Sequence, residues 1–108
     1  PAGALAAFAP GRPGFYAVTD GAKGVYAWID GRVAHFPAYP VDVVDTLCAG
    51  DVWHGAFALA VGQGRALPDG IRIASAAAAL KCTRPGGGDG VPMRAELTAF
   101  LGPHGVTV

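Results

Sequence analysis

The stretch that decides the fold is Val43-Val44-Asp45-Thr46-Leu47-Cys48-Ala49-Gly50-Asp51-Val52-Trp53-His54-Gly55-Ala56-Phe57-Ala58. Two valines lead into an Asp-Thr turn, and small residues then precede an acid at the head of an apolar helix. The first amides of a helix lack partners and carry partial positive charge, so they attract anions such as phosphate. Small residues also let a ligand approach the main chain. The stretch therefore predicts an anion site at a helix N-terminus.

Asp51 is the unexpected part of this site, because a carboxylate beside bound phosphate repels it unless the carboxylate takes up a proton. We therefore interpret Asp51 as a general base beside the helix end. The alternative is an ordinary first-turn acid that only interacts with the helix dipole, worth about 0.5–2 kcal/mol. Spacing alone leaves both interpretations open.

The composition excludes several classes of function. The chain has 108 residues, of which 52% are apolar, and eight basic residues balance eight acidic ones. This neutral charge gives no argument for nucleic acid or an anionic membrane as partner, and no apolar run is long enough to span a membrane.

Cys48 and Cys82 form no C-x-x-C pair, which favours reduced thiols and a cytoplasmic protein. Because the chain begins with Pro1 and lacks a basic leader, we expect a piece of a longer protein that forms one domain at most.

Periodicity predicts strands followed by helices. Short apolar runs predict the strands, an Asp-Gly pair predicts a hairpin between the last two, and wide apolar faces closed by glycines predict the helices. The predicted helices are 2–9, 51–61, 68–83 and 93–101, and the predicted strands are 15–19, 25–29 and 32–36. Strands followed by three helices indicate the C-terminal part of a three-layer α/β fold, with ligand at the strand ends.

The motif from Asp45 to Asp51, followed by Gly55-Ala56-Phe57-Ala58, resembles the second signature of the PfkB (ribokinase-like) family of carbohydrate and nucleoside kinases. The resemblance implies a ribokinase-like three-layer α/β/α sandwich, of which residues 1–108 are the C-terminal nucleotide-binding and catalytic part. In that family the Ala-Gly-Asp backbone forms an anion hole, and its Asp deprotonates the substrate hydroxyl. The resemblance therefore implies an anion hole at Cys48, Ala49 and Gly50, with Asp51 as base. Cys48 departs from the usual Gly or Ala.

Two further segments are similar to nucleotide-binding parts of the family. The segment Thr19-Asp20-Gly21-Ala22-Lys23-Gly24 has the form T-x-G-x-x-G. By itself this pattern is more typical of an ordinary β-turn than of a nucleotide site. The resemblance implies ATP contacts at Thr19, Gly21 and Gly24. Residues 76–92 are similar to a late helix and a following glycine loop, here 84–92, that wall the adenine. The resemblance implies contacts at Ala79 and Gly86. By composition alone, that loop could equally be a flexible surface segment.

The resemblance also implies metal ions. Family members can hold a monovalent cation such as K⁺ between the Asp of the Asp-Thr pair and carbonyls of the glycine loop. Asp45 and Leu47 match half of that site, whereas Gly90 stands where some members have a hydroxyl side chain. Mg²⁺ is expected together with ATP. The family's N-x-x-E magnesium motif does not occur here, because the chain contains no asparagine.

The function expected from the resemblance is ATP-dependent phosphorylation of a sugar or sugar-like hydroxyl. Its partners would be the small-molecule sugar and ATP, without nucleic acid or membrane, and a homodimer through a lid outside this chain is left open. We expect the fragment alone to be inactive, since the sugar contacts belong to the missing portion. The alternatives are a nucleoside kinase of the same family and a non-catalytic fragment that binds nucleotides or anions.

Overall fold

The computed structural model describes all 108 residues, which divide into two compact units, Pro1–Ala38 and Tyr39–Val108. The order of elements is helix, three strands and then three helices, with short 3₁₀ turns between them. Their bounds are α1 Ala2–Phe8, β1 Tyr16–Thr19, η1 Gly21–Lys23, β2 Val25–Ile29, β3 Arg32–Phe36, α2 Ala49–Gly62, α3 Leu67–Cys82, η2 Gly88–Gly90, α4 Arg94–Leu101 and η3 Gly102–His104.

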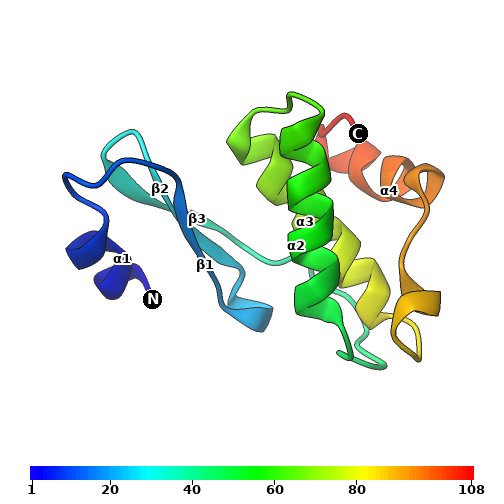
Figure 1. Cartoon of the computed structure of the whole chain (residues 1–108). Helices are drawn as coiled ribbons and strands as arrows, with labels where there is room; N and C mark the ends of the chain where they lie inside the picture. Colours follow the sequence, from blue (N-terminus) through cyan, green and yellow to red (C-terminus); the bar gives the residue numbers. More distant parts are fainter. The chain divides into compact units, whose positions relative to one another are not determined.

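The first unit is an antiparallel three-stranded sheet in the order β1-β2-β3. Asp30 and Gly31 both have positive φ, 53° and 76°, in the two-residue hairpin between β2 and β3. This conformation matches the right-handed twist of the strands and is the one that Asp-Gly predicts. Helix α1 packs on the sheet (Figure 1) and buries Leu5, which is 4% exposed. The strands predicted from apolar runs are therefore confirmed.

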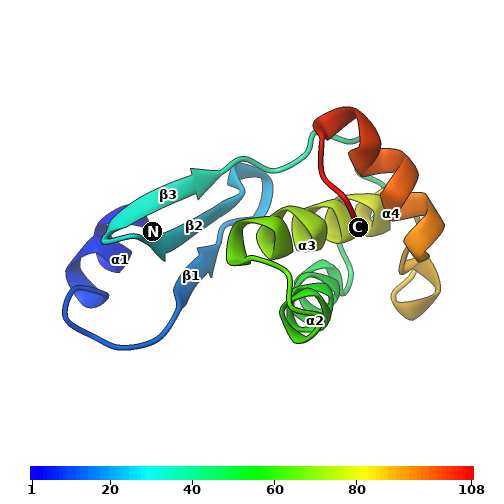
Figure 2. The same ribbon diagram turned by 90° about the horizontal axis from the view of Figure 1, so that it is seen from above.

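The second unit is a group of three helices. Helices α2 and α3 lie side by side, and α4 lies beside α3 (Figures 1 and 2). The core between them is built from small and branched apolar side chains, whose small members let the helix backbones approach closely. Its buried members are Ala60, Ile73, Ala76, Ala77, Leu97 and Leu101. The indole N–H of Trp53 donates to the hydroxyl of Ser75 at 3.1 Å, which further joins α2 to α3.

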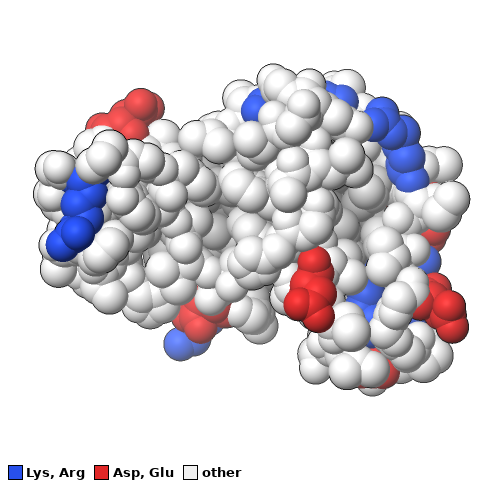
Figure 3. Space-filling model, viewed as in Figure 1, with Lys and Arg blue, Asp and Glu red and all other residues white.

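The predicted helices match the observed ones to within two residues at each end. The helices and the small antiparallel sheet are the elements expected of part of an α/β domain. None of the helices combines the length and hydropathy that crossing a membrane requires. Figure 3 shows one face of the molecule, on which charged side chains are scattered and most atoms belong to uncharged residues.

Leu101 tests the core of the second unit, because it is completely buried at the C-terminal end of α4. We expect Leu101→Ala to lower the free energy of unfolding by about 2–5 kcal/mol, through lost apolar burial and the cavity that remains. Denaturant unfolding measures the change. The control is Thr98→Ala on the exposed face of the same helix, which should change stability by no more than about 0.5 kcal/mol. Equal effects of the two substitutions would contradict this core.

Candidate active site

The turn before α2 is fixed by Asp45. Its Oδ1 accepts the amide of Leu47 at 2.8 Å, and its Oδ2 accepts the amide of Gly86 at 3.0 Å. The carbonyl of Cys82, the last residue of α3, accepts the amides of Val44 and Asp45 at 2.7 and 3.1 Å. These bonds join the turn to the end of α3 and to the glycine loop, although 41 residues separate Asp45 from Gly86. The position at which α2 starts is thereby set.

These contacts also determine how Asp45 ionises. The amide of Leu47, and after it that of Gly86, hold the pKa of the Asp45 carboxyl below its usual range. Partial desolvation opposes this shift, and the positive charge of Lys81 adds to it. Donors that point at a carboxylate stabilise its charged form. Asp45 is therefore a structural carboxylate that remains ionised in the folded protein at neutral pH.

The N-terminus of α2 presents amides without partners. Its cap residue, Cys48, forms no hydrogen bond through its side chain. The amide of Ala49 donates to the carbonyl of Thr46 at 3.1 Å, so this predicted member of the anion hole is already occupied. The amides of Gly50 and Asp51 have no acceptor within the chain. The donors open to an anion are therefore those of Gly50 and Asp51.

Cys48 adopts a left-handed backbone conformation with φ of 62°. This conformation costs a residue with a Cβ about 1–2 kcal/mol and costs glycine very little. The turn nevertheless forms with cysteine in place, as expected for a small side chain. A Cβ added at Gly87 would lie 3.2 Å from the Cys48 sulfur, so a glycine in the loop leaves room for the thiol.

Asp51 lies in the first turn of α2 and is exposed, and its side chain forms no hydrogen bond or ion pair within the chain. It lines a cavity of about 550 Å³ together with Cys48, residues of α2, α3 and α4, and the segment 88–92. The cavity wall is mostly apolar, with members such as Val52 and Leu97, and its volume is in the range of small-molecule sites. The carboxylate and the unpaired amides therefore stand beside a cavity.

His54 lies one turn beyond Gly50 on the same helix. Its Nδ1 is 2.7 Å from the carbonyl oxygen of Gly50. Because a carbonyl only accepts, Nδ1 carries the proton. This bond holds the ring against the first turn of α2, so that His54 supports the backbone of the site.

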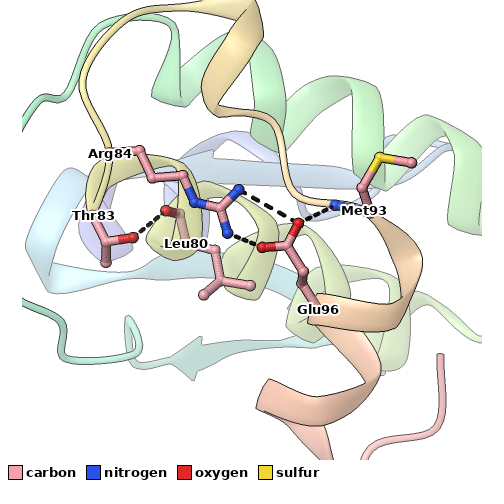
Figure 4. A network of polar contacts seen from close by, with 5 residues as sticks. All are labelled: Leu80, Thr83, Arg84, Met93 and Glu96. Atoms are coloured by element: carbon pink, nitrogen blue, oxygen red, sulfur yellow. Dashed lines mark hydrogen bonds and ion pairs between the residues drawn. The ribbon is translucent and has the colours of Figure 1, made fainter.

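The glycine loop is held at both ends (Figure 4). The guanidinium of Arg84 pairs with the carboxylate of Glu96, which also accepts the amide of Met93 at 3.0 Å. The Thr83 hydroxyl donates to the carbonyl of Leu80 at 2.6 Å. The bond from Arg84, followed by that from Met93, lowers the pKa of Glu96. The cation of Arg84 thus closes the loop onto the start of α4.

The other predicted nucleotide contacts differ in accessibility. Gly86 is partly buried with φ of 84°, and its amide is used by Asp45, while Ala79 is buried in α3. Thr19 and Gly21 belong to the first unit and are exposed at the turn between β1 and β2. Gly24, in the same turn, is buried.

Gly24 has a structural reason to be glycine. Its φ is 98°, and a Cβ there would collide with the carbonyl of Phe36 and lie 2.7 Å from the amide of Ala38. The T-x-G-x-x-G segment is therefore a tight turn in which the last glycine permits a close backbone approach. Thr19 and Gly21 remain the accessible members of the motif.

With this geometry in place, comparison with known proteins identifies the family. The family description "pfkB family carbohydrate kinase" matches residues 2–94. The chain belongs to the PfkB family of carbohydrate kinases, and the resemblance first seen in the motif at 45–51 is confirmed.

Relatives and solved structures agree with this assignment. Ribokinase of Haemophilus influenzae is 34% identical over 84 residues, which cover 78% of this chain and 28% of that protein. The bifunctional protein HldE of Azorhizobium caulinodans is 43% identical over 101 residues, covering 91% and 21%. Arabidopsis thaliana ribokinase, solved in complex with ribose and ATP, is 32% identical with a TM-score of 0.76, covering 81% and 28%. The chain thus spans less than a third of the length of these relatives.

A pH series tests the role of Asp45. Asp45→Asn replaces one acceptor oxygen by a donor, so the bond from Leu47 or that from Gly86 is lost. We expect a lower thermal midpoint than the wild type at neutral pH. A carboxyl whose pKa is lower in the folded than in the unfolded state stabilises the fold. This stabilisation is complete above the pKa of the unfolded state, about 3.9, and is lost as the pH falls through the lower pKa of the folded state. The difference between variant and wild type should therefore shrink below about pH 4.

The control for this experiment is Asp42→Asn, which makes the same change at an exposed position three residues earlier. It should leave the thermal midpoint close to that of the wild type across the series. If the deficit of Asp45→Asn were equally large at all pH values, the carboxylate charge would not be what fixes the turn.

Proposed function

We propose that the complete protein containing this chain is a sugar kinase that transfers the γ-phosphoryl group of ATP to a hydroxyl of its substrate. One observation carries the proposal. In a motif that matches the family signature, the unengaged carboxylate of Asp51 and the unpaired amides of Gly50 and Asp51 meet at one helix end beside a cavity. This arrangement offers a proton acceptor and anion-stabilising donors at the same place.

In this proposal each group has a separate task. Bound ATP supplies the phosphoryl group. The carboxylate of Asp51 accepts the proton of the attacking hydroxyl, and the amides of Gly50 and Asp51 stabilise negative charge near the N-terminus of α2. Phosphoryl transfer depends mainly on positioning and electrostatic stabilisation. The rigid turn held by Asp45 is suited to this task because it fixes where the amides point.

The family relationship supports the substrate class. Relatives of this chain include ribokinases, and the Arabidopsis enzyme was solved with ribose and ATP. The match to the bifunctional protein HldE covers at least as much of this chain as the match to ribokinase, so the family relationship does not single out ribose. We propose a sugar or sugar-like substrate. A coupled ADP-release assay of the full-length gene product over ketoses, sugar acids and nucleosides would identify it.

Within the complete protein we propose residues 1–108 as the C-terminal nucleotide-binding and catalytic part, unable to phosphorylate a sugar alone. Thr19 and Gly21 are the proposed nucleotide contacts of the first unit, since both are exposed. No three metal-ligating side chains gather anywhere in residues 1–108, and Mg²⁺ stays a prediction from the family. The cytoplasmic location and a homodimer stay predictions as well.

The base assignment is tested by Asp51→Asn in the full-length protein. We expect kcat to fall by about 10²–10⁴, because the amide cannot accept the hydroxyl proton. ATP should still bind, because the amides at the helix end are retained. Initial rates and ATP titration by calorimetry measure the two properties separately.

Asp69→Asn is the matched control, because Asp69 occupies the first turn of the neighbouring helix α3. It makes the same chemical change at a similar place in a helix and should leave kcat within about twofold of the wild type. Unchanged turnover in Asp51→Asn would reject Asp51 as the base. ATP binding without turnover in any well of the sugar panel would favour the non-catalytic alternative.

A further inference from the structure

Lys81 is a buried cation for which the proposed reaction has no direct use. It lies in the last turn of α3 and is 0% exposed. Its ammonium donates to the carbonyl of Asp45 at 2.9 Å and to the carbonyl of Arg84 at 3.2 Å. A buried charge is strongly unfavourable unless it is compensated. Here the two carbonyl oxygens and the negative C-terminal end of α3 compensate it.

The two carbonyls belong to the segments between which the family resemblance implies a monovalent cation. One lies in the Asp-Thr turn and the other at the start of the glycine loop. Proteins bind K⁺ with carbonyl oxygens that replace its water shell, and an ammonium that donates to such oxygens meets the same electrostatic demand. Lys81 thus places a positive charge from the chain itself between the turn and the loop.

The carboxylate expected to help bind K⁺ is also engaged. Both carboxylate oxygens of Asp45 accept backbone amides, from Leu47 and Gly86. A metal ion at the Asp45 carbonyl would compete with the Lys81 ammonium and be repelled by its charge. The residues present therefore do not fit an additional monovalent cation at this turn.

The lack of a side chain at Gly90 leaves room for the side chain of Lys81. A Cβ built at Gly90 would lie 3.2 Å from Cε and 3.5 Å from Cγ of Lys81, and 3.7 Å from Cβ of Arg84. A larger residue at this position would press on the lysine side chain. The absence of a hydroxyl side chain at Gly90 and the presence of Lys81 are therefore complementary features of one arrangement.

We propose that Lys81 is a positioning residue whose ammonium takes the place of the monovalent cation, so that this kinase works without K⁺. Lys81 donates neither to Asp51 nor to any acceptor at the start of α2, since its ammonium bonds only to the carbonyls of Asp45 and Arg84. It acts by holding the Asp45 turn and the glycine loop together, which fixes the start of α2. The proposal rests on the proposed kinase function for its catalytic consequence, whereas its structural part stands without it.

The first test uses the unaltered full-length protein. Its thermal midpoint and its initial rate are measured in KCl and in choline chloride at the same ionic strength of about 0.1 M. We expect the midpoint to be unchanged and the rate to differ by less than about twofold, because no site is left for K⁺ to stabilise. A K⁺-specific rise in midpoint or severalfold activation would overturn the proposal. The midpoint needs no sugar substrate, so it tests Lys81 even if the kinase assignment fails.

The second test removes both the ammonium and the aliphatic side chain of Lys81. Lys81→Ala should lower kcat at least about tenfold with a smaller change in KM for the sugar, because positioning is lost. K⁺ or methylammonium should restore part of the rate and raise the thermal midpoint, because a small cation can then reach the two carbonyls. Two results would overturn the proposal. One is a wild-type rate of Lys81→Ala in choline chloride, and the other is a lowered rate that neither K⁺ nor methylammonium raises.

Arg72→Met is the matched control, since it removes a cation from the same helix at a half-exposed position paired with Asp69. It should keep the wild-type rate and show no response to K⁺ or methylammonium. A response of Arg72→Met as large as that of Lys81→Ala would show a general salt effect and overturn the assignment to Lys81.

Discussion

The carboxylate and carbonyl of Asp45 are the contacts on which the rest of the second unit's site depends. Through them the turn before α2 is bonded to Leu47, to Gly86 in the glycine loop and to Lys81 at the end of α3. The bonds to Gly86 and Lys81 span 41 and 36 residues. Closing such long loops costs entropy that a few well-directed polar bonds must offset. Because the partners are amides and an ammonium, all of them favour the charged carboxylate or the polarised carbonyl. The turn is therefore rigid for electrostatic reasons.

Rigidity at this point has a direct chemical consequence for α2. The helix starts at Ala49, and its cap residue is held in a left-handed conformation without a capping side chain. A helix end of this kind would normally be capped, since unpaired amides are unfavourable away from solvent. Leaving the amides of Gly50 and Asp51 open preserves the local positive potential. The missing cap lowers the stability of the helix end at the position where the proposed reaction places negative charge, as is common at functional sites.

The sequence predicted the elements well, because apolar periodicity and glycine or proline stops are local signals. It also placed Asp51 at the start of α2. It did not predict that Ala49 would bond to Thr46, because that bond depends on the left-handed backbone of Cys48. The burial of Lys81 was missed for a different reason. A lysine at the end of an alanine run is typical of a solvated helix end, and only the fold brings two carbonyls to its ammonium. The pairing of Arg84 with Glu96 likewise needs the conformation of the loop.

The two acids of the motif illustrate how one short segment separates structure from chemistry. Asp45 uses both carboxylate oxygens on backbone amides, which lowers its pKa and makes it a poor proton acceptor. The carboxylate of Asp51, six residues later in the sequence, forms no hydrogen bond within the chain, and Asp51 lines a cavity. If both carboxylates were engaged, the segment would be a rigid turn without a base. If neither were, the start of α2 would not be fixed. The division of roles follows from geometry, because only Asp45 precedes the helix and lies within reach of the loop amide.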